Sequence, residues 1–300
     1  MKGYAKKIMS VLTATIMLLT VLVATPINAE ESQAPQMEWG RLPIGGGGFV
    51  SGIVTGQEAM YLRTDVGGAY RYEDGKWVQL LNHISEEDRG YLSVESIAID
   101  PTDDDIVYML AGCNYFSNAR TVIFRSTDGG RTMDTVDVSD YIRVHGNGPG
   151  RQNGERLAVD PNNTNVLYCG GRTGGLIKST DYGKTWTMVD TLDVLDTEVK
   201  WPQWTDLVLK STANQNGICS IVVDAHDSDT VYVAVSKIGE TNVYVTRDGC
   251  KTWSALDKSL PTNLYPQRIK LDANKDLLIM YSDGVSCDGS KGAAYRYDTI

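Results

Sequence analysis

Cysteine and histidine are scarce in this sequence. Only five cysteines and three histidines occur among 300 residues, and the cysteines lie 31 to 56 residues apart, with no CxxC pair. An odd cysteine count leaves at least one thiol unpaired, and this spacing supports neither a zinc motif nor a disulfide framework. We therefore expect no metal site and no other cofactor, and we expect the cysteines to be buried small hydrophobic residues.

An excess of positive charge is also lacking. The chain has 28 lysines and arginines against 38 aspartates and glutamates, which gives a net charge of −10. Nucleic acids and anionic membrane surfaces are bound mainly through clustered positive charge. The composition therefore argues against both as partners, and it leaves neutral polymers and cations open.

Only one long hydrophobic run occurs, and it lies near the start. Ile8 to Val23 is apolar, three lysines precede it, and "INA" ends at Ala29. These features are typical of a signal peptide, and a run of about 16 residues is shorter than the roughly 20 that span a bilayer. The alternative is a membrane anchor. We predict a signal peptide at 1–29 and a linker at 30–36, hence a secreted, extracellular protein. Removal of three lysines and no acidic residue makes its net charge −13.

Helical periodicity is missing from residues 37–300, where short strand pairs repeat instead. "SIAIDPTDDDIVYMLAG" has three later counterparts, "RLAVDPNNTNVLYCGG", "SIVVDAHDSDTVYVAVS" and "RIKLDANKDLLIMYSDG". Each has a strand, a polar turn opened by aspartate, and a second apolar strand, which indicates antiparallel hairpins. The turn aspartates are Asp100, Asp160, Asp224 and Asp272, and eight residues beyond them stand Tyr108, Tyr168, Tyr232 and Met280.

A second repeated motif follows three of these strand pairs. "STDGGRTM", "STDYGKTW" and "TRDGCKTW" fit the pattern S/T-x-D-x-G-x-T-W of the Asp-box (BNR-like) repeat, with its aspartate at Asp128, Asp181 and Asp248. We expect each of these structural aspartates to hydrogen-bond the backbone of a tight hairpin. Repeats of about 50 to 65 residues with four strands each predict an all-β fold, a β-propeller with five visible modules in 37–300.

Several blocks, in the same order, resemble one known family. "IGGGGFVSGIV", "YLRTDVGGAYRY", "GYLSVESIAIDP", "NGERLAVDPNNTNVLYCGGRTGGLIKSTDYGKTW" and "LLIMYSDGVSCDG" are similar to the xyloglucanases, glycoside hydrolase family 74. The resemblance implies an inverting hydrolase of the endo-β-1,4-glucanase type, which acts on xyloglucan or a related plant cell-wall polysaccharide. It also implies two seven-bladed propellers, of which this chain would hold an incomplete first one. The segments "SEEDRGYLSV" and "GPGRQNGER" depart from the family pattern, which leaves the choice of polysaccharide open.

The resemblance implies that Asp65 is the general base, through the motif "TD-x-GG-x-Y". The family's general acid lies in the second propeller and has no counterpart here, so we expect this chain alone to be weakly active or inactive. The alternative is that Asp65 is one more turn aspartate, because "RTDVGGAY" aligns with "STDGGRTM". In that alignment Arg63 replaces the first hydroxyl residue and Tyr70 the final aromatic position, so most turn-closing groups are missing. We favour the catalytic role.

Sugar rings are bound by aromatic platforms and hydrogen-bonding side chains in clefts. Such side chains occur in the loops "GCNYFSNAR", "WPQWTD" and "GPGRQNGER", and in "RGYLS". We therefore expect substrate contacts from Tyr91, Asn114, Tyr115, Phe116, Arg151, Trp201 and Trp204. The alternative is that these aromatic side chains pack within their own loops.

Two other functions share parts of this pattern. A non-catalytic Asp-box propeller would bind a glycan or a protein without hydrolysis, since a fold does not determine a function. A sialidase also carries Asp-boxes, and "GRLP" has a faint similarity to its Arg-x-Pro signal, but the order of the blocks fits it poorly.

Overall fold

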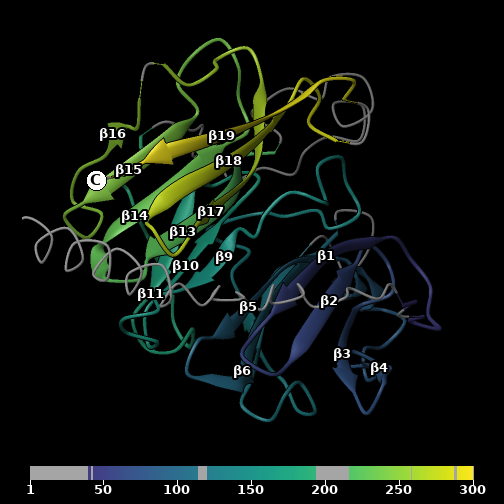
Figure 1. Cartoon of the computed structure of the whole chain (residues 1–300). Helices are drawn as coiled ribbons and strands as arrows, with labels where there is room; N and C mark the ends of the chain where they lie inside the picture. Colours follow the sequence, from purple (N-terminus) through teal and green to yellow (C-terminus); the bar gives the residue numbers. More distant parts are fainter. Residues whose placement is uncertain are drawn as a thin grey trace, which may run out of the picture. The chain divides into compact units, whose positions relative to one another are not determined.

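The computed structural model describes residues 40–41, 43–113, 120–193, 216–257, 259–286 and 289–299. The chain divides into two compact units, Met1–Arg41 and Leu42–Ile300, and every described strand belongs to the second. Five antiparallel sheets, each made of consecutive strands, form the blades of a β-propeller (Figure 1). The prediction of an all-β propeller with five modules is confirmed.

The first two blades follow each other directly in the chain. Blade 1 contains β1 (Val50–Thr55), β2 (Met60–Thr64), β3 (Ala69–Glu73) and β4 (Lys76–Gln79). A short 3-10 helix, η1 (Arg89–Leu92), lies in the connection to blade 2. Blade 2 contains β5 (Val94–Asp100), β6 (Asp103–Gly112), β7 (Thr121–Ser126) and β8 (Asp134–Asp137).

The remaining three blades repeat this order. Blade 3 contains β9 (Leu157–Val159), β10 (Leu167–Gly170), β11 (Leu176–Ser179) and β12 (Thr187–Met188). Blade 4 contains β13 (Ile218–Asp224), β14 (Asp227–Val235), β15 (Val243–Arg247) and β16 (Ser254–Ala255). Blade 5 has three described strands, β17 (Tyr265–Leu271), β18 (Asp276–Ser282) and β19 (Gly292–Asp298).

The hydrophobic core is divided into layers between neighbouring blades. Successive side chains of a strand point to opposite faces, so each second strand packs against the blades on both sides. In β6, Met109 packs in the layer shared with blade 1, whereas Tyr108 packs in the layer shared with blade 3. Tyr168 and Tyr232 occupy the same position in blades 3 and 4 and are equally buried. The repeat seen in the sequence is thus a repeat of inter-blade packing.

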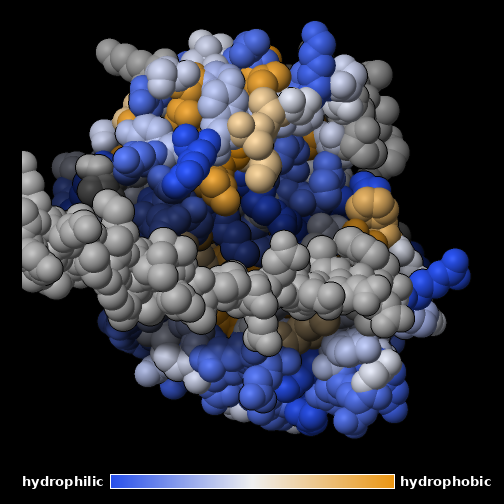
Figure 2. Space-filling view, in the orientation of Figure 1, coloured by the Kyte–Doolittle hydropathy of each residue, from blue (hydrophilic) through white to orange (hydrophobic). Residues whose placement is uncertain are grey.

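The outer face of blade 5 differs from the faces between blades. Met280 takes the place of the repeated tyrosine and is 45% exposed, and Tyr295 on β19 is also exposed. Figure 2 shows apolar side chains at the surface in the part of the view where β18 and β19 lie in Figure 1. The position therefore carries a buried tyrosine only where a following blade covers it.

Aspartates stabilise two kinds of hairpin turn. At the β5–β6 turn, Asp100 Oδ1 accepts the Thr102 N–H at 2.8 Å, and the corresponding turns of blades 3, 4 and 5 do the same through their own aspartates. At the β7–β8 turn, Asp128 Oδ1 accepts the Thr132 N–H at 2.9 Å and the Ser126 hydroxyl at 2.7 Å. Asp181 and Asp248 make matching bonds in blades 3 and 4. We call the turns around Asp128, Asp181 and Asp248 the aspartate turns.

The first strands of neighbouring blades contact one another, and charged side chains are buried among them. The most connected is Glu155, in the segment between β8 and β9. Its carboxylate accepts the Ser96 hydroxyl at 2.7 Å and the Ile97 N–H at 2.8 Å from β5, and it pairs with Arg63 of β2 at 2.9 Å. Its backbone carbonyl accepts the Ile221 N–H of β13 at 2.9 Å. One residue therefore joins blades 1, 2 and 4.

A second buried ion pair lies at Glu95 on β5. Arg172 and Arg156 contact Glu95 Oε1 at 2.8 and 3.1 Å, and the His145 N–H donates to Oε2 at 3.1 Å. Burial acts to raise the pKa of Glu95, but the positive charges of Arg172 and Arg156 outweigh it and bring the pKa to about 2. Burial, assisted by Arg172, lowers the pKa of His145 to about 3. The folded protein therefore keeps Glu95 ionised and His145 neutral.

Loss of the Glu155 carboxylate should destabilise the propeller strongly. Replacement Glu155→Ala leaves the buried Arg63 guanidinium without its counter-ion, which costs about 3–5 kcal/mol for buried pairs. Urea unfolding followed by circular dichroism measures this. The control is Glu86→Ala, which removes the exposed pair with Arg89 and should cost less than about 1 kcal/mol. Equal effects of the two substitutions would contradict the central role of Glu155.

Acid should weaken the fold in two stages. The pKa of His145 is lower in the folded than in the unfolded state, so the unfolded chain takes up a proton first as pH falls below about 6.5. This lowers the free energy of unfolding by about 2 kcal/mol at pH 5. Glu95 adds a second loss between about pH 4.5 and 2, because its folded pKa is lowered.

Unfolding measured in urea at pH 7 and pH 5 tests the first stage. In His145→Gln the difference in unfolding free energy between pH 7 and pH 5 should be smaller by about 2 kcal/mol. The exposed His83 provides the control, and His83→Gln should keep the difference of the unaltered chain. An unchanged difference in His145→Gln would contradict the assignment.

Candidate active site

The two ends of a blade carry different connections between strands. One end carries the turn between the first two strands and the turn between the last two; we call it the turn end. The other, which we call the loop end, carries the turn between the second and third strands and the connection to the next blade. Contacts between blades follow this division: Asp104 of the β5–β6 turn accepts the Ala59 N–H of the β1–β2 turn, and Leu92 of the blade 1–2 connection accepts the Gly68 N–H of the β2–β3 turn.

Asp65 lies at the loop end, in the β2–β3 turn, whereas the aspartate turns lie at the turn end. Thr64 closes the turn of Asp65: its hydroxyl donates to the Gly68 carbonyl at 2.9 Å and accepts the Gly67 N–H at 2.8 Å. The carboxylate of Asp65 is therefore available for other contacts. The turn of Asp65 therefore resembles the aspartate turns in sequence, but it lies at the opposite end of the blade.

The carboxylate of Asp65 is held by two groups from outside its turn. Oδ1 accepts the Phe49 N–H at 2.7 Å, and Arg151 Nε lies 3.2 Å from Oδ2. The Asp65 N–H in turn donates to the Phe49 carbonyl at 3.1 Å, so both backbone groups of Phe49 engage Asp65. Asp65 is only 7% exposed. Each carboxylate oxygen can accept two hydrogen bonds, so both oxygens keep capacity for a water molecule.

Glycines around Asp65 allow this close packing of backbone on backbone. Gly48 has φ +100°, and a Cβ there would lie 3.0 Å from Asp65 Oδ1. A Cβ at Gly67 would lie 2.1 Å from the Gly47 carbonyl oxygen. Gly67 is thus needed for contact between the β2–β3 turn and the segment before β1.

Arg151 reaches Asp65 because Arg63 holds the segment that carries it. Arg63 stands two residues before Asp65 on β2 and is fully buried. Its guanidinium donates to the backbone carbonyls of Arg151 at 2.6 Å and Asn153 at 2.8 Å, besides pairing with Glu155. The Arg151 guanidinium lies over the Phe49 ring, 5.1 Å from its centroid. Arg151, predicted as a substrate contact, is therefore placed directly beside the predicted base.

Sequence reasoning missed Phe49, Arg63 and Glu155. The available signal for Arg63 was an arginine within the otherwise buried strand "MYLRT", because a fully buried arginine needs a partner. Nothing comparable marked Phe49, whose role depends on contacts made by its backbone.

Tyr91, also predicted as a substrate contact, is only 7% exposed. It lies in η1 and packs edge-on against Phe124, with ring centroids 6.1 Å apart. The other five predicted contacts, Asn114, Tyr115, Phe116, Trp201 and Trp204, lie outside the described residues.

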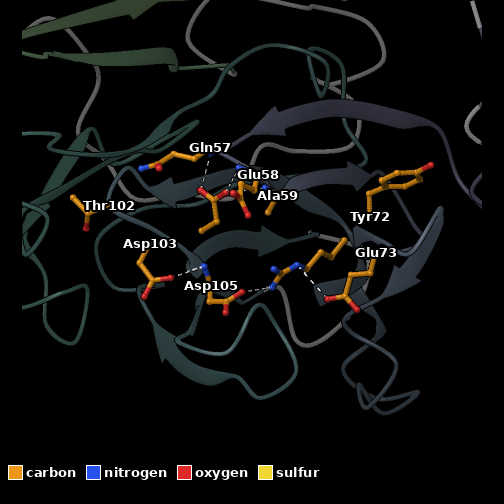
Figure 3. A pocket seen from close by; sticks show the side chains of 10 residues that line it. Gln57, Glu58, Ala59, Tyr72, Glu73, Thr102, Asp103 and Asp105 are labelled. Carbon is orange, nitrogen blue, oxygen red and sulfur yellow. Dashed lines mark hydrogen bonds and ion pairs between the residues drawn. The ribbon is translucent and has the colours of Figure 1, made fainter.

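A pocket of about 440 Å³ occurs at the turn end, between the β1–β2 and β5–β6 turns (Figure 3). Its acidic side chains already have partners: Asp104 accepts the N–H groups of Gln57, Glu58 and Ala59, and Asp105 pairs with Arg71. This pocket joins two blades and lies at the opposite end of blade 1 from Asp65.

Neither a metal cluster nor a membrane-spanning helix is found in the described ranges. Cys113, Cys169, Cys219 and Cys250 are buried, as we expected, and burial raises the pKa of Cys219 to about 12. Such thiols are unreactive at neutral pH. Cys287 lies outside the described residues.

Comparison with known proteins identifies relatives along nearly the whole chain. No family model matches it. The chain is 35% identical to the xyloglucanase Xgh74A of Acetivibrio thermocellus, over 99% of the chain and 36% of that protein. It is 32% identical to an oligoxyloglucan-reducing end-specific xyloglucanase of Emericella nidulans, over 94% of the chain and 36% of that protein.

Solved structures agree with these relatives. The GH74 enzyme of Niastella koreensis superposes with a TM-score of 0.75 and 39% identity, over 87% of this chain and 37% of that one. The chain thus spans about a third of the length of the relatives it matches. It belongs to glycoside hydrolase family 74, the xyloglucanase family, and matches that family's N-terminal propeller.

Proposed function

We propose that this propeller supplies the general base, Asp65, of an inverting glycoside hydrolase that cleaves the β-1,4-glucan backbone of xyloglucan. The observation that supports this most directly is the placement of the Asp65 carboxylate. It is held at the loop end by Phe49 and Arg151, and Thr64 takes over the closing of its turn. The names of the relatives support the substrate class.

In this mechanism a water molecule lies between the Asp65 carboxylate and the anomeric carbon. The water oxygen bonds to the anomeric carbon while Asp65 accepts a proton from the water. The bond between the anomeric carbon and the leaving oxygen breaks in the same step. A carboxylic acid on the other side of the sugar gives its proton to the leaving oxygen. The two carboxyl groups of inverting enzymes are about 6.5–9.5 Å apart, which leaves room for the water.

The general acid has to come from elsewhere than the two glutamates described in this region. Glu95 is ionised and paired with Arg172 and Arg156, and Glu155 is held by Arg63 and by two donors of β5. Both carboxylates are thus engaged in structural contacts within the propeller. We therefore propose that the acid belongs to a second propeller, and that this chain is part of a longer, secreted protein whose first propeller has seven blades with Asp-boxes at the aspartate turns.

The intact mass of the protein secreted by the native organism tests this arrangement. A mass more than twice that of this chain, with an N-terminus at Glu30, fits a two-propeller enzyme with a cleaved signal peptide. A secreted protein of this chain's own mass would instead favour the non-catalytic, glycan-binding propeller.

Asp65→Asn should abolish most hydrolysis while polysaccharide binding persists. Loss of a general base typically costs on the order of 10²–10⁴-fold in rate. Release of reducing sugar from xyloglucan by the longest native form measures this, and NMR of the first product formed tests inversion at the anomeric carbon. Asp128→Asn, which alters an aspartate turn, is the matched control and should retain activity. Undiminished activity in Asp65→Asn would refute the assignment, and binding without hydrolysis in the unaltered protein would favour the non-catalytic alternative.

A further inference from the structure

Phe49 stands beside the carboxylate of Asp65 and is 51% exposed, although it is a large aromatic residue. Its backbone N–H and carbonyl both bond Asp65, at 2.7 and 3.1 Å. The position of the ring is therefore tied to the position of the predicted base. Exposed hydrophobic residues are common singly, so exposure alone would mean little without this connection.

The two faces of the Phe49 ring have different surroundings. The Arg151 guanidinium lies over one face at 5.1 Å and also contacts Asp65 at 3.2 Å. A cation over an aromatic face is an attractive contact, so Arg151 supports the ring from one side. Because Phe49 is 51% exposed, part of its surface is left for a ligand. Arg151 thus contacts both the Phe49 ring and the Asp65 carboxylate. Its own backbone is held by a hydrogen bond from Arg63 to the Arg151 carbonyl.

Val66 adds apolar surface directly after Asp65, and it is 47% exposed. Exposed apolar side chains therefore occur at Phe49, whose backbone bonds Asp65, and at Val66, the next residue along the chain. The faces of a β-linked glucose ring present C–H groups, which pack on aromatic rings, while its hydroxyls lie around the edge. This combination of an apolar platform and an adjacent acceptor matches a neutral sugar better than a charged ligand.

We propose that Phe49 is the sugar-stacking platform of the Asp65 site and binds a glucose unit of the β-1,4-glucan backbone. The inference rests on the proposed function, because it takes its ligand class from that function. It assigns to Arg151 the task of supporting the ring and the carboxylate.

Affinity electrophoresis in native gels tests the platform, since soluble xyloglucan in the gel retards a protein that binds it even weakly. Hydroxyethylcellulose in a second gel tests the unbranched backbone. Phe49→Ala should weaken binding about tenfold or more, because it removes the aromatic face. Phe49→Trp should stay within about threefold of the unaltered chain, because it keeps such a face.

Two exposed residues provide matched controls. Tyr182 is 45% exposed but lies in an aspartate turn at the turn end, and Ile53 is 49% exposed farther along β1. Tyr182→Ala and Ile53→Ala should bind like the unaltered chain. An equal loss in Ile53→Ala would show that a general change in the β1 edge, not the platform, is responsible. Thermal unfolding of Phe49→Ala checks that the variant is folded.

The outcomes separate this inference from the function on which it rests. If the unaltered chain binds xyloglucan and folded Phe49→Ala binds equally well, the platform is refuted and the hydrolase proposal stands. If the unaltered protein in its longest native form binds neither polysaccharide, the proposed substrate class fails and the platform fails with it. Weakened binding in Phe49→Ala, restored in Phe49→Trp, supports both.

Discussion

The pair between the buried Arg63 and the partly buried Glu155 is the interaction on which both the fold and the candidate site depend. Glu155 brings strands of blades 1, 2 and 4 together through its carboxylate and its backbone carbonyl. Arg63 uses its remaining donors to hold the segment that carries Arg151. A buried ion pair of this kind adds little net stability over an apolar pair, but removal of either partner is costly. Its value here is geometric, because it fixes a loop from between blades 2 and 3 against a strand of blade 1.

The same residue type serves two purposes at the two ends of the blades. At the turn end, the carboxylates of Asp128, Asp181 and Asp248 accept hydrogen bonds from their own hairpins. Burial acts to raise the pKa of Asp181, but the hydrogen bonds from Thr185 outweigh it and bring the pKa to about 2. At the loop end, Thr64 satisfies the turn, so the Asp65 carboxylate can face groups from other segments. What distinguishes the two roles is the hydrogen-bonding of the neighbouring residue and the place of the turn in the strand order.

The sequence allowed the blades to be predicted because their signals are local. Strand alternation, the turn aspartates and the tyrosine at Tyr108, Tyr168 and Tyr232 all repeat within a few residues of one another. The surroundings of Asp65 could not be predicted in the same way. Arg63 meets Glu155 across 92 residues of sequence, and Phe49 contributes through its backbone, which carries no sequence signal. The segment "GPGRQNGER" was expected to be a loop with a substrate contact, whereas Glu155 and Arg156 within it are central to the packing of the inner strands.

Buried charge also bears on the proposal that this acidic chain binds a neutral sugar. Around the inner strands at the loop end, Glu95 and Glu155 are matched by Arg63, Arg156 and Arg172. Arg151 stands beside Asp65, and the neighbouring Phe49 and Val66 are exposed apolar residues. A sugar chain that approaches Phe49 and Val66 would meet apolar surface and a single oriented acceptor. An exposed cluster of carboxylates would instead select cations, so the pairing of Glu95 and Glu155 with arginines is consistent with the proposed binding of an uncharged polymer.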